Sequence, residues 1–280
     1  MPSWEIDFYR RPLHDPQGNE LWELLVCTSE GTWQHHACCP QPEVNAKWLE
    51  TQLQQLVEIG HEHPEQIRVF RPQTLHLLEL ACEPLGIPVE PTRHTPALKQ
   101  WLVERSHLYP TLPNYTRQPY QPLDVDKPPP MPLSENLWGD RWRFAALSAG
   151  ELIDFGTGYP IPILEMPEFL LPLKLGLAST ATIPGIVIDG GRRSMSLARW
   201  LQQSHPSALN YVPGAPDGLI LEAGLVDRWV VATFEDPDVK AAAQLFEQRK
   251  QTGRGLHFLL VQPDDSGVTY TGFWLLKAEG

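Results

Sequence analysis

Two carboxylates on neighbouring predicted strands, Asp7 and Glu23, are the side chains best suited to metal-dependent chemistry. Acids at adjacent strand positions can hold two metal ions and promote an in-line phosphoryl displacement. A complete site of this kind needs further acids at later strand ends, where the sequence has Arg71 and Arg93 instead. Arginines there suit phosphate binding better than metal binding. We therefore expect a non-catalytic protein and keep a metal-dependent nuclease as an alternative.

Residues 35–39, in the order HHACC, have side chains that can bind zinc. If this segment is a strand, alternation sends Cys38 to the face opposite His35 and Cys39. A structural zinc site normally takes four ligands from paired motifs, and no C-x-x-C pair accompanies the cluster. We therefore expect no metal site, and we interpret the four cysteines of the chain as reduced thiols.

A glycine-rich turn with two arginines, GGRRS at residues 190–194, joins a predicted strand to a predicted amphipathic helix. Backbone N–H groups at a helix N-terminus, together with guanidinium groups, can cradle a phosphate. Arg192 and Arg193 are therefore candidates for phosphate contact. The turn lacks the GxGxxG and Walker spacings, so we expect no nucleotide cofactor.

The first 109 residues predict strands and helices in the order βββαβαβα. Residues 4–11 and 22–28 alternate as the two arms of a hairpin. Asn45 is a candidate cap for the first helix, which Gly60 should end. The remaining elements are strands at 32–37, 67–71 and 87–90, a helix at 74–85, and a helix that starts at Thr95 and Pro96. This order predicts an α/β domain that is ribonuclease H-like or restriction-endonuclease-like.

Residues 110–136 contain eight prolines among 27 residues. A segment of this composition forms a stiff, extended connector and has too little apolar periodicity for a core of its own. We therefore predict two α/β domains, with mixed sheets and flanking helices, at residues 1–109 and 137–280. Residues 110–136 would be a proline-rich linker between them.

The best-defined element of the second domain is a helix capped by Asp236, with Pro237 at its first position and Gly253 at its end. The other predicted elements are strands at 142–147 and 186–189, a helix through Leu197 and Leu201, a hairpin of 219–223 and 228–234, and closing strands at 256–261 and 269–276. The last strand carries Trp274, whose indole would stack on bases if it were exposed.

The chain has a net charge of −12, from 22 basic and 34 acidic residues. This charge has the wrong sign for a protein that coats nucleic acid non-specifically through its phosphates. A nucleic-acid site on such a chain must be a local basic and aromatic patch, because the rest of the surface repels the phosphate backbone.

No apolar run approaches the roughly 20 residues that cross a bilayer. The longest candidate, residues 169–177, is broken by Pro172 and Lys174. A strand is expected to begin at Trp4, which leaves no room for a signal or transit peptide. We therefore expect a cytoplasmic protein of a bacterial cell, without a membrane span.

Five segments resemble those of one family, the RNA-binding Tab/Atab proteins of cyanobacteria and chloroplasts. They are WEIDFYRRP at residues 4–12, IRVFR at 67–71, ENLWGD at 135–140, GLHFL at 255–259 and GFWLL at 272–276. The resemblance spans the whole chain. It implies an RNA-binding factor that acts on A/U-rich mRNAs of photosystem subunits and promotes their translation and photosystem assembly. It also implies single-stranded RNA, in an mRNA leader, as the partner, with translation or assembly proteins as further partners.

An RNA site of this kind would use guanidinium groups on phosphates and aromatic rings on unpaired bases, because single-stranded RNA exposes base faces that a duplex hides. The candidate RNA-binding residues are Tyr9, Arg10, Arg11, Arg71, Arg93, Arg192, Arg193 and Trp274. A second interpretation is a scaffold that recruits other proteins through the proline-rich linker and exposed aromatic residues.

Overall fold

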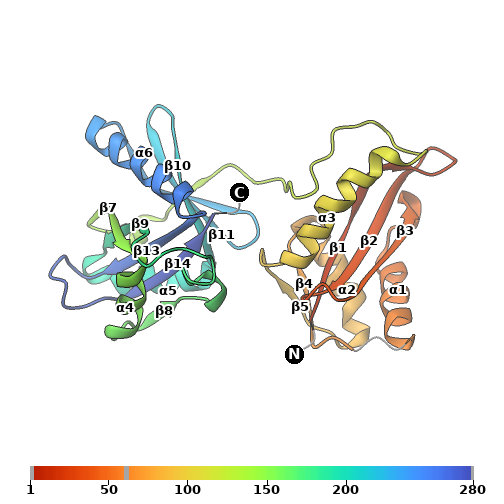
Figure 1. Cartoon of the computed structure of the whole chain (residues 1–280), viewed down its shortest axis with the longest axis horizontal. Coiled ribbons are helices and arrows are strands. Elements are labelled where there is room, and N and C mark those ends of the chain that lie inside the picture. Colours follow the sequence, from red (N-terminus) through yellow and green to blue (C-terminus); the bar gives the residue numbers. More distant parts are fainter. Residues whose placement is uncertain (1–2, 60–62, 279–280) are drawn as a thin grey trace. The chain divides into compact units, whose positions relative to one another are not determined.

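A computed structural model of the 280-residue chain describes residues 3–59 and 63–278. The chain divides into two compact units, Met1–Asp126 and Lys127–Gly280, which we call unit 1 and unit 2 (Figure 1). Among the described residues, no helix has both the length and the apolar character that a membrane span requires.

Unit 1 contains a five-stranded sheet with the order β3-β2-β1-β4-β5. The strands are β1 (Ser3–His14), β2 (Glu20–Thr28), β3 (Gln34–Pro40), β4 (Gln66–Val69) and β5 (Val89–Pro91). The first three form an antiparallel meander, and β4 and β5 extend it in parallel from β1. The predicted order βββαβαβα is therefore present, and the predicted α/β fold class is confirmed.

The helices of unit 1 are α1 (Ala46–Glu58), α2 (Pro72–Cys82) and α3 (Pro96–Leu108). The Asn45 side chain accepts a hydrogen bond from the Trp48 N–H at 2.9 Å, so the predicted cap is confirmed. The predicted stop at Gly60 lies outside the described residues. Pro96 takes the first position of α3, where its missing N–H leaves no helical bond unmade.

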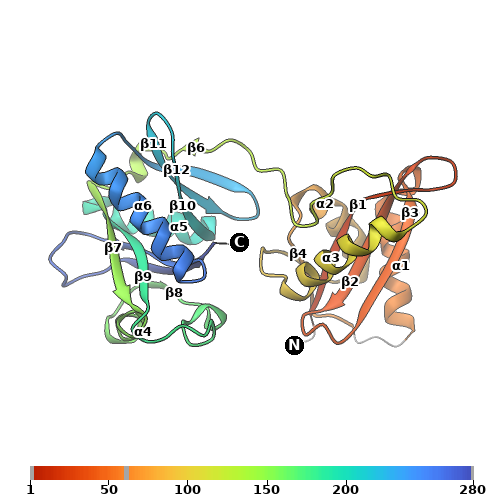
Figure 2. The same ribbon diagram turned by 45° about the horizontal axis from the view of Figure 1, so that its top comes forward.

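The two faces of the unit 1 sheet carry different side chains, because successive residues of a strand point to opposite faces. Ile6 and Leu24 pack in the core beneath α1 and α2, whereas Leu25 packs in a second core with α3. Figures 1 and 2 show α3 lying over β1 and β2. Asp7 and Glu23 lie on this α3 face, where both carboxylates are fully buried.

Unit 2 contains two sheets, a four-stranded one with the order β10-β11-β12-β6 and a five-stranded one with the order β7-β9-β13-β14-β8. The strands are β6 (Met131–Pro132), β7 (Arg141–Ser148), β8 (Ile163–Glu165), β9 (Thr182–Asp189), β10 (Pro206–Val212), β11 (Asp217–Ala223), β12 (Asp227–Phe234), β13 (Leu256–Gln262) and β14 (Gly272–Lys277). The prediction of mixed sheets is confirmed, since β9 runs parallel to β13 and antiparallel to β7.

The helices of unit 2 are α4 (Ala149–Gly158), α5 (Ser194–Ser204) and α6 (Pro237–Thr252). Figure 2 shows α6 lying across β7 and β9. One core holds Leu197 of α5 and Phe246 of α6 against one face of the five-stranded sheet, and a second core holds Leu152 of α4 on the other face. The predicted Asp236 cap is confirmed, because its Oδ1 accepts from two backbone N–H groups of α6.

Candidate nucleic-acid interface

The acidic residues of unit 1 form a buried, charged centre with arginines. Arg11 Nη2 donates to Asp7 Oδ2 at 2.8 Å, and Arg11 Nε donates to Glu23 Oε2 at 3.2 Å. Arg71 Nε donates to Asp7 Oδ1 at 2.9 Å. Arg105 of α3 bonds Glu23 through two of its nitrogens, and the Tyr109 hydroxyl donates to Glu23 Oε2 at 2.6 Å. We call these two carboxylates and three guanidinium groups the acidic centre.

The protonation of the acidic centre follows from this arrangement. Burial opposes ionisation of Asp7, but the guanidinium groups of Arg11 and Arg71 outweigh it and lower the pKa of this carboxyl. Burial raises the pKa of Tyr109, and the neighbouring Glu23 charge raises it further, so the hydroxyl remains a donor. All four carboxylate oxygens accept hydrogen bonds from protein groups. The acidic centre therefore does not present the free carboxylate oxygens that a two-metal site needs.

Residues 120–124 of the proline-rich segment cover the acidic centre. The Tyr120 hydroxyl accepts from Arg11 Nη1 at 2.9 Å, while the carbonyl oxygens of Asp124 and Pro122 accept from Arg71 at 2.8 and 2.9 Å. Arg11 is 3% exposed and Arg71 is 1% exposed. The prediction that these two arginines contact RNA does not fit the structure, because every guanidinium nitrogen of Arg71 is already bonded inside unit 1.

The other candidates of unit 1 lie nearer the surface. Tyr9 is half-buried, with the Arg71 guanidinium over its ring at 4.2 Å and the Trp22 indole at its edge. Arg10 is exposed. Arg93 is half-buried in the loop after β5, and its carbonyl accepts from Lys99 Nζ at 2.6 Å. Tyr9 and Arg10 are therefore adjacent, whereas Arg93 belongs to another segment.

In the glycine-rich turn of unit 2, the backbone N–H groups of both glycines are bonded to carbonyls at the end of β13. The N–H of Gly190 donates to the Gln262 carbonyl at 2.8 Å, and the N–H of Gly191 donates to the Pro263 carbonyl at 2.9 Å. The Arg193 N–H donates back to Gly190. The predicted backbone cradle for phosphate is therefore wrong, because these N–H groups already have carbonyl partners. The side chains of Arg192 and Arg193 remain candidates for anion contact at this turn.

Gly191 is nevertheless required by the local geometry. Its φ is +54°, in the left-handed region that favours glycine. A side chain there would also collide with the carboxylate of Asp140, which belongs to the ENLWGD motif. The Asp140 N–H donates to the Asp189 carbonyl at 2.7 Å, at the end of β9. The ENLWGD motif and the GGRRS turn are thus packed against each other.

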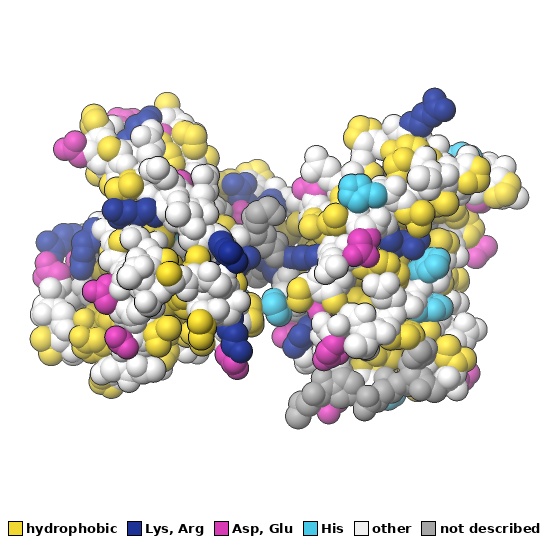
Figure 3. Space-filling view, in the orientation of Figure 1, with side chains coloured by type: hydrophobic (Ala, Val, Ile, Leu, Met, Phe, Trp, Pro, Cys, Tyr) yellow, Lys and Arg dark blue, Asp and Glu magenta, His cyan; other side chains and the backbone are white. Residues whose placement is uncertain are grey.

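Four arginines surround this junction, and we call them the arginine edge: Arg141, Arg143, Arg192 and Arg193. Arg141 pairs with Asp265 at 3.1 Å, Arg143 with the buried Asp189 at 3.0 Å, and Arg193 with Asp140 at 3.1 Å. The side chains of the three paired arginines are 66%, 46% and 43% exposed. Figure 3 shows Lys and Arg side chains beside Asp and Glu side chains on the side of unit 2 where Figure 1 draws β7.

The predicted RNA-binding residues Arg192 and Arg193 thus lie with Arg141 and Arg143, which were not predicted as RNA-binding residues. Arg192 is exposed. The pattern R-W-R at residues 141–143 could have predicted this pair of arginines. Alternation in a strand places both arginines on one face and the tryptophan on the other. The structure has this arrangement, with Trp142 packed against a core of unit 2.

Trp138 of the ENLWGD motif is 51% exposed, next to a cavity of about 430 Å³. The indole Nε1 donates to the Leu133 carbonyl at 2.9 Å. The cavity, which we call the Trp138 cavity, is lined mainly by apolar side chains from four segments, and Arg141 is its charged member. The apolar lining includes Leu133, Leu137, Trp138, Trp142, Ile188, Leu197 and Val231. The ENLWGD motif is one of the segments that resemble the family, but Trp138 was not among the predicted RNA-binding residues.

Trp274 is a core residue. It is 1% exposed and packs with Leu197 and Phe246 in the larger core of unit 2. Gly272 leaves room for its ring, since a side chain at that position would overlap the indole. The predicted stacking role for Trp274 is therefore wrong in this structure, because a base cannot reach a buried ring.

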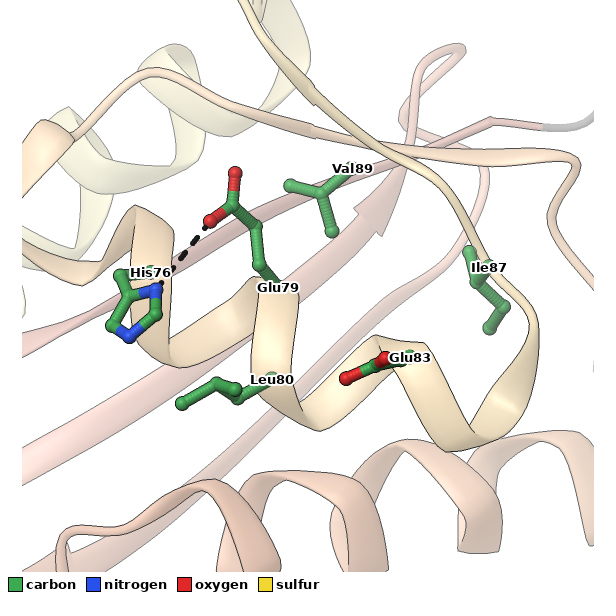
Figure 4. Close-up of a pocket in the computed structure, with 6 residues that line it drawn as sticks. All are labelled: His76, Glu79, Leu80, Glu83, Ile87 and Val89. Atoms are coloured by element: carbon green, nitrogen blue, oxygen red, sulfur yellow. Dashed lines mark ion pairs between the residues drawn. The ribbon is translucent and has the colours of Figure 1, made fainter.

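A second cavity, of about 400 Å³, lies beside α2 in unit 1. Figure 4 shows Glu79 and Leu80 on this helix, His76 one turn before them, and Glu83 directly after the end of the helix. His76 Nδ1 lies 3.7 Å from Glu79 Oε2. Two carboxylates at the mouth repel phosphates, so this cavity is a poor candidate for an RNA site.

The described residues contain no group of three or more His, Cys, Asp or Glu arranged to hold a metal ion. In β3, His35 and Cys39 point to the more buried face and Cys38 to the exposed one, as strand alternation predicts. Burial raises the pKa of Cys38 to about 11, and the Glu23 charge adds to this increase.

Comparison with known proteins identifies relatives along the whole chain. The family model for the C-terminal domain of the RNA-binding protein Tab2/Atab2 matches residues 120–277, and the model for its N-terminal domain matches residues 3–105. "Protein TAB2 homolog, chloroplastic" of Arabidopsis thaliana is 31% identical, over 99% of this chain and 74% of its own length. The protein of the same name from Zea mays is 30% identical, over 98% of this chain and 71% of its own length.

Two solved structures align with part of this chain. The catalytic core domain of BIV integrase aligns with 38% of this chain and 64% of its own, with 19% identity and a TM-score of 0.26. A simian T-cell lymphotropic virus intasome in complex with PP2A regulatory subunit B56 gamma contains a chain that aligns with 52% of this one and 62% of its own, with 10% identity and a TM-score of 0.29. Both alignments cover less than two thirds of the solved chain.

Proposed function

Because this chain belongs to the Tab2/Atab2 family of RNA-binding proteins, we propose that it is a non-enzymatic factor for A/U-rich mRNA leaders. In this proposal it binds single-stranded leaders of mRNAs for photosystem subunits and promotes their translation and photosystem assembly. Translation or assembly proteins would be its further partners. We propose a cytoplasmic location, although both relatives are named chloroplastic.

The arginine edge of unit 2 is the observation that carries this proposal. Four arginines lie here with the three aspartates that pair with them and with the exposed Glu135 and Asp264, so four of these nine charged side chains are basic, compared with 22 of 56 in the chain. The region is thus less acidic than the chain, whose net charge is −12. Each guanidinium has five donors, so an arginine that pairs with one aspartate can still bond a phosphate.

Unit 2 is also the less acidic half of the chain. It has 13 basic and 17 acidic residues, whereas unit 1 has 9 basic and 17 acidic residues. Long-range repulsion of RNA is therefore weaker at unit 2. We propose Arg192 and Arg193, with Arg141 and Arg143, as the phosphate contacts, and keep Tyr9 and Arg10 of unit 1 as a second candidate surface.

The non-enzymatic part of the proposal is supported by the acidic centre. Arg11, Arg71 and Arg105 are bonded to the carboxylates of Asp7 and Glu23, where a nuclease of this fold class would need metal ions. Such an arrangement fits a domain that has the fold without the reaction, because function depends on the site and not on the fold.

The proposal is tested by comparing RNA ligands and charge variants of the full chain. Fluorescence anisotropy should show tighter binding of a single-stranded A/U-rich RNA than of duplex RNA or single-stranded DNA of equal length. The double variant Arg192→Gln/Arg193→Gln should bind more weakly and reduce the slope of log K against log salt by about 1.4, since each phosphate contact on a single strand contributes about 0.7.

Arg117→Gln is the matched control, because Arg117 is an exposed arginine of unit 1 outside the arginine edge. It should leave the affinity and the salt slope unchanged. Equal binding of all three nucleic acids would refute the proposed specificity. If Tyr9→Ala and Arg10→Gln weaken binding while Arg192→Gln/Arg193→Gln does not, the RNA site lies on unit 1.

A protein-binding scaffold is the second candidate function, and the exposed hydrophobic residues of one segment favour it. Unit 2 exposes large hydrophobic side chains within residues 153–173, namely Ile153, Tyr159, Leu164, Phe169 and Leu173, which are 38%, 43%, 41%, 45% and 79% exposed. Large exposed apolar side chains mark a protein interface where they form a contiguous patch. Failure of the intact chain to bind any RNA would leave this function as the better account.

A further inference from the structure

We infer that the Trp138 cavity is a binding pocket for one unpaired nucleobase of the RNA. The inference rests on the proposed function, because it names the place where a base of the bound strand is held. It assigns a recognition role to Trp138 of the ENLWGD motif, which lies next to the arginine edge, and a phosphate-holding role to Arg141 beside it.

The size and lining of the cavity suit a planar aromatic ring. Its volume of about 430 Å³ is within the range of small-molecule sites, roughly 300–1,000 Å³. Leu133, Leu137 and Ile188 give it apolar walls, and the indole rings of Trp138 and Trp142 line it as well. Flat aromatic surfaces bind the faces of bases with little regard to sequence, because every base has a π-face.

The Trp138 ring is held in place before a ligand arrives. Its Nε1 donates to the Leu133 carbonyl at 2.9 Å, which fixes the rotation of an indole that is still 51% exposed. Gly139 follows it, and a Cβ there would approach Ile188 Cγ2 to 2.5 Å, so only glycine lets the chain pass this closely. A side chain ordered in the free protein loses little conformational entropy on binding.

Charge favours a nucleotide over an apolar protein side chain as the occupant. Arg141 lines the cavity, and its side chain is 66% exposed and bonded to Asp265 through Nη2. Arg143 follows two residues later on the same strand face. A base in the cavity would therefore have guanidinium groups next to it, at a position suited to the phosphate of the same nucleotide. A leucine or phenylalanine side chain would make no use of them.

The edge of β12 offers hydrogen bonds for the base. β6 pairs with β12 only at Trp229 and Val230, and in the described part of the chain no strand pairs with this edge of β12 beyond them. Val231 follows Val230, Thr233 comes two residues later, and both line the cavity. N–H and C=O groups on an unpaired strand edge can bond a partner that lies alongside. Base edges carry matching donors and acceptors.

Binding of a fluorescein-labelled, single-stranded A/U-rich RNA by the full chain tests the inference. Trp138→Ala should raise the Kd about 5- to 150-fold, the range that a loss of about 1–3 kcal/mol of stacking produces. The salt slope should stay unchanged, because a neutral ring releases no counterions. Trp138→Phe should bind more tightly than Trp138→Ala, since a phenyl ring still stacks.

A second variant leaves the indole in place. Thr233 is exposed at the cavity, so Thr233→Leu should narrow the cavity without opening a core, and should also raise the Kd. Tyr159→Ala is the matched control, because Tyr159 is a 43% exposed aromatic residue outside the cavity. It should bind as the intact chain does. RNA with 5-iodouridine, irradiated in the complex, should crosslink to the peptide that contains Trp138.

The results separate this inference from the proposed function. If Trp138→Ala and Thr233→Leu bind as the intact chain does while Arg192→Gln/Arg193→Gln binds weakly, the base pocket is wrong and RNA binding stands. A crosslink confined to unit 1 would likewise overturn the pocket. If the intact chain binds no RNA, both the pocket and the proposed function fail.

Discussion

Replacing Arg71 by methionine should destabilise unit 1 strongly, because it removes one partner of a buried ion pair. Arg71 Nε lies 2.9 Å from Asp7 Oδ1, with side chains that are 2% and 0% exposed. Removing one partner of such a pair typically costs about 3–5 kcal/mol of unfolding free energy. Asp7 keeps its bond to Arg11, so we expect a value near the lower limit, about 3 kcal/mol.

Urea unfolding followed by circular dichroism measures this loss as a shift of the midpoint at constant slope. Arg68→Met is the matched control, since Arg68 lies on β4 and pairs with Glu90 at 3.0 Å, with side chains that are 28% and 45% exposed. An exposed pair contributes about 0–1 kcal/mol. The same chemical change should therefore cost far more at Arg71 than at Arg68.

A second substitution tests the cause of the loss. Adding Asp7→Asn to Arg71→Met removes the buried charge that lost its partner, so the double variant should be more stable than the sum of the single losses predicts. Equal midpoints for Arg71→Met and Arg68→Met would refute the reasoning, because the buried pair would then contribute no more than the exposed one.

Three further outcomes are expected. Burial lowers the pKa of His257 to about 3, while its Nε2 accepts from the Leu209 N–H at 2.8 Å. The unfolded chain takes up this proton near pH 6.5, so the unfolding free energy should fall by about 1.4 kcal/mol per pH unit between pH 6 and pH 4, and urea titrations of His257→Gln should show a flatter profile. Asp236→Ala should lower the unfolding free energy by about 1 kcal/mol in thermal melts, because the cap of α6 is lost, and an unchanged melting temperature would contradict this role. Magnesium or manganese should bring no cleavage of RNA or DNA, and metal-dependent products that Asp7→Asn abolishes would show that the acidic centre can open.

The element order of unit 1 could be predicted because its signals are local. Alternating strands, the Asn45 cap and the Pro96 helix start are each contained within a few residues. In unit 2, α4 and β8 were not predicted. The ten residues of α4 include three glycines, and β8 has only three residues. Glycine lowers helix propensity, and a three-residue strand shows no alternation.

The candidate site was harder to predict because burial depends on distant segments. Arg71 is buried partly by the Asp124 and Pro122 carbonyls, which are 53 and 51 residues away along the chain. Trp274 is buried by helices of unit 2 that precede it by tens of residues. Trp138, by contrast, is exposed within a motif that was quoted for its resemblance. Residue type alone separates neither the buried arginine from the exposed ones nor the core indole from the surface one.

The ion pairs of Asp7 and Glu23 in unit 1 also mean that a single mutation cannot create a metal-dependent nuclease site. Clearing Asp7 for a metal ion requires the loss of both Arg11 and Arg71, and clearing Glu23 requires the loss of Arg105 as well. Each single loss leaves a buried charge short of a partner and lowers stability before any cleavage appears. Mutational routes to a nuclease therefore pass through poorly folded intermediates. For a member of an RNA-binding family, this barrier protects against an accidental gain of cutting activity.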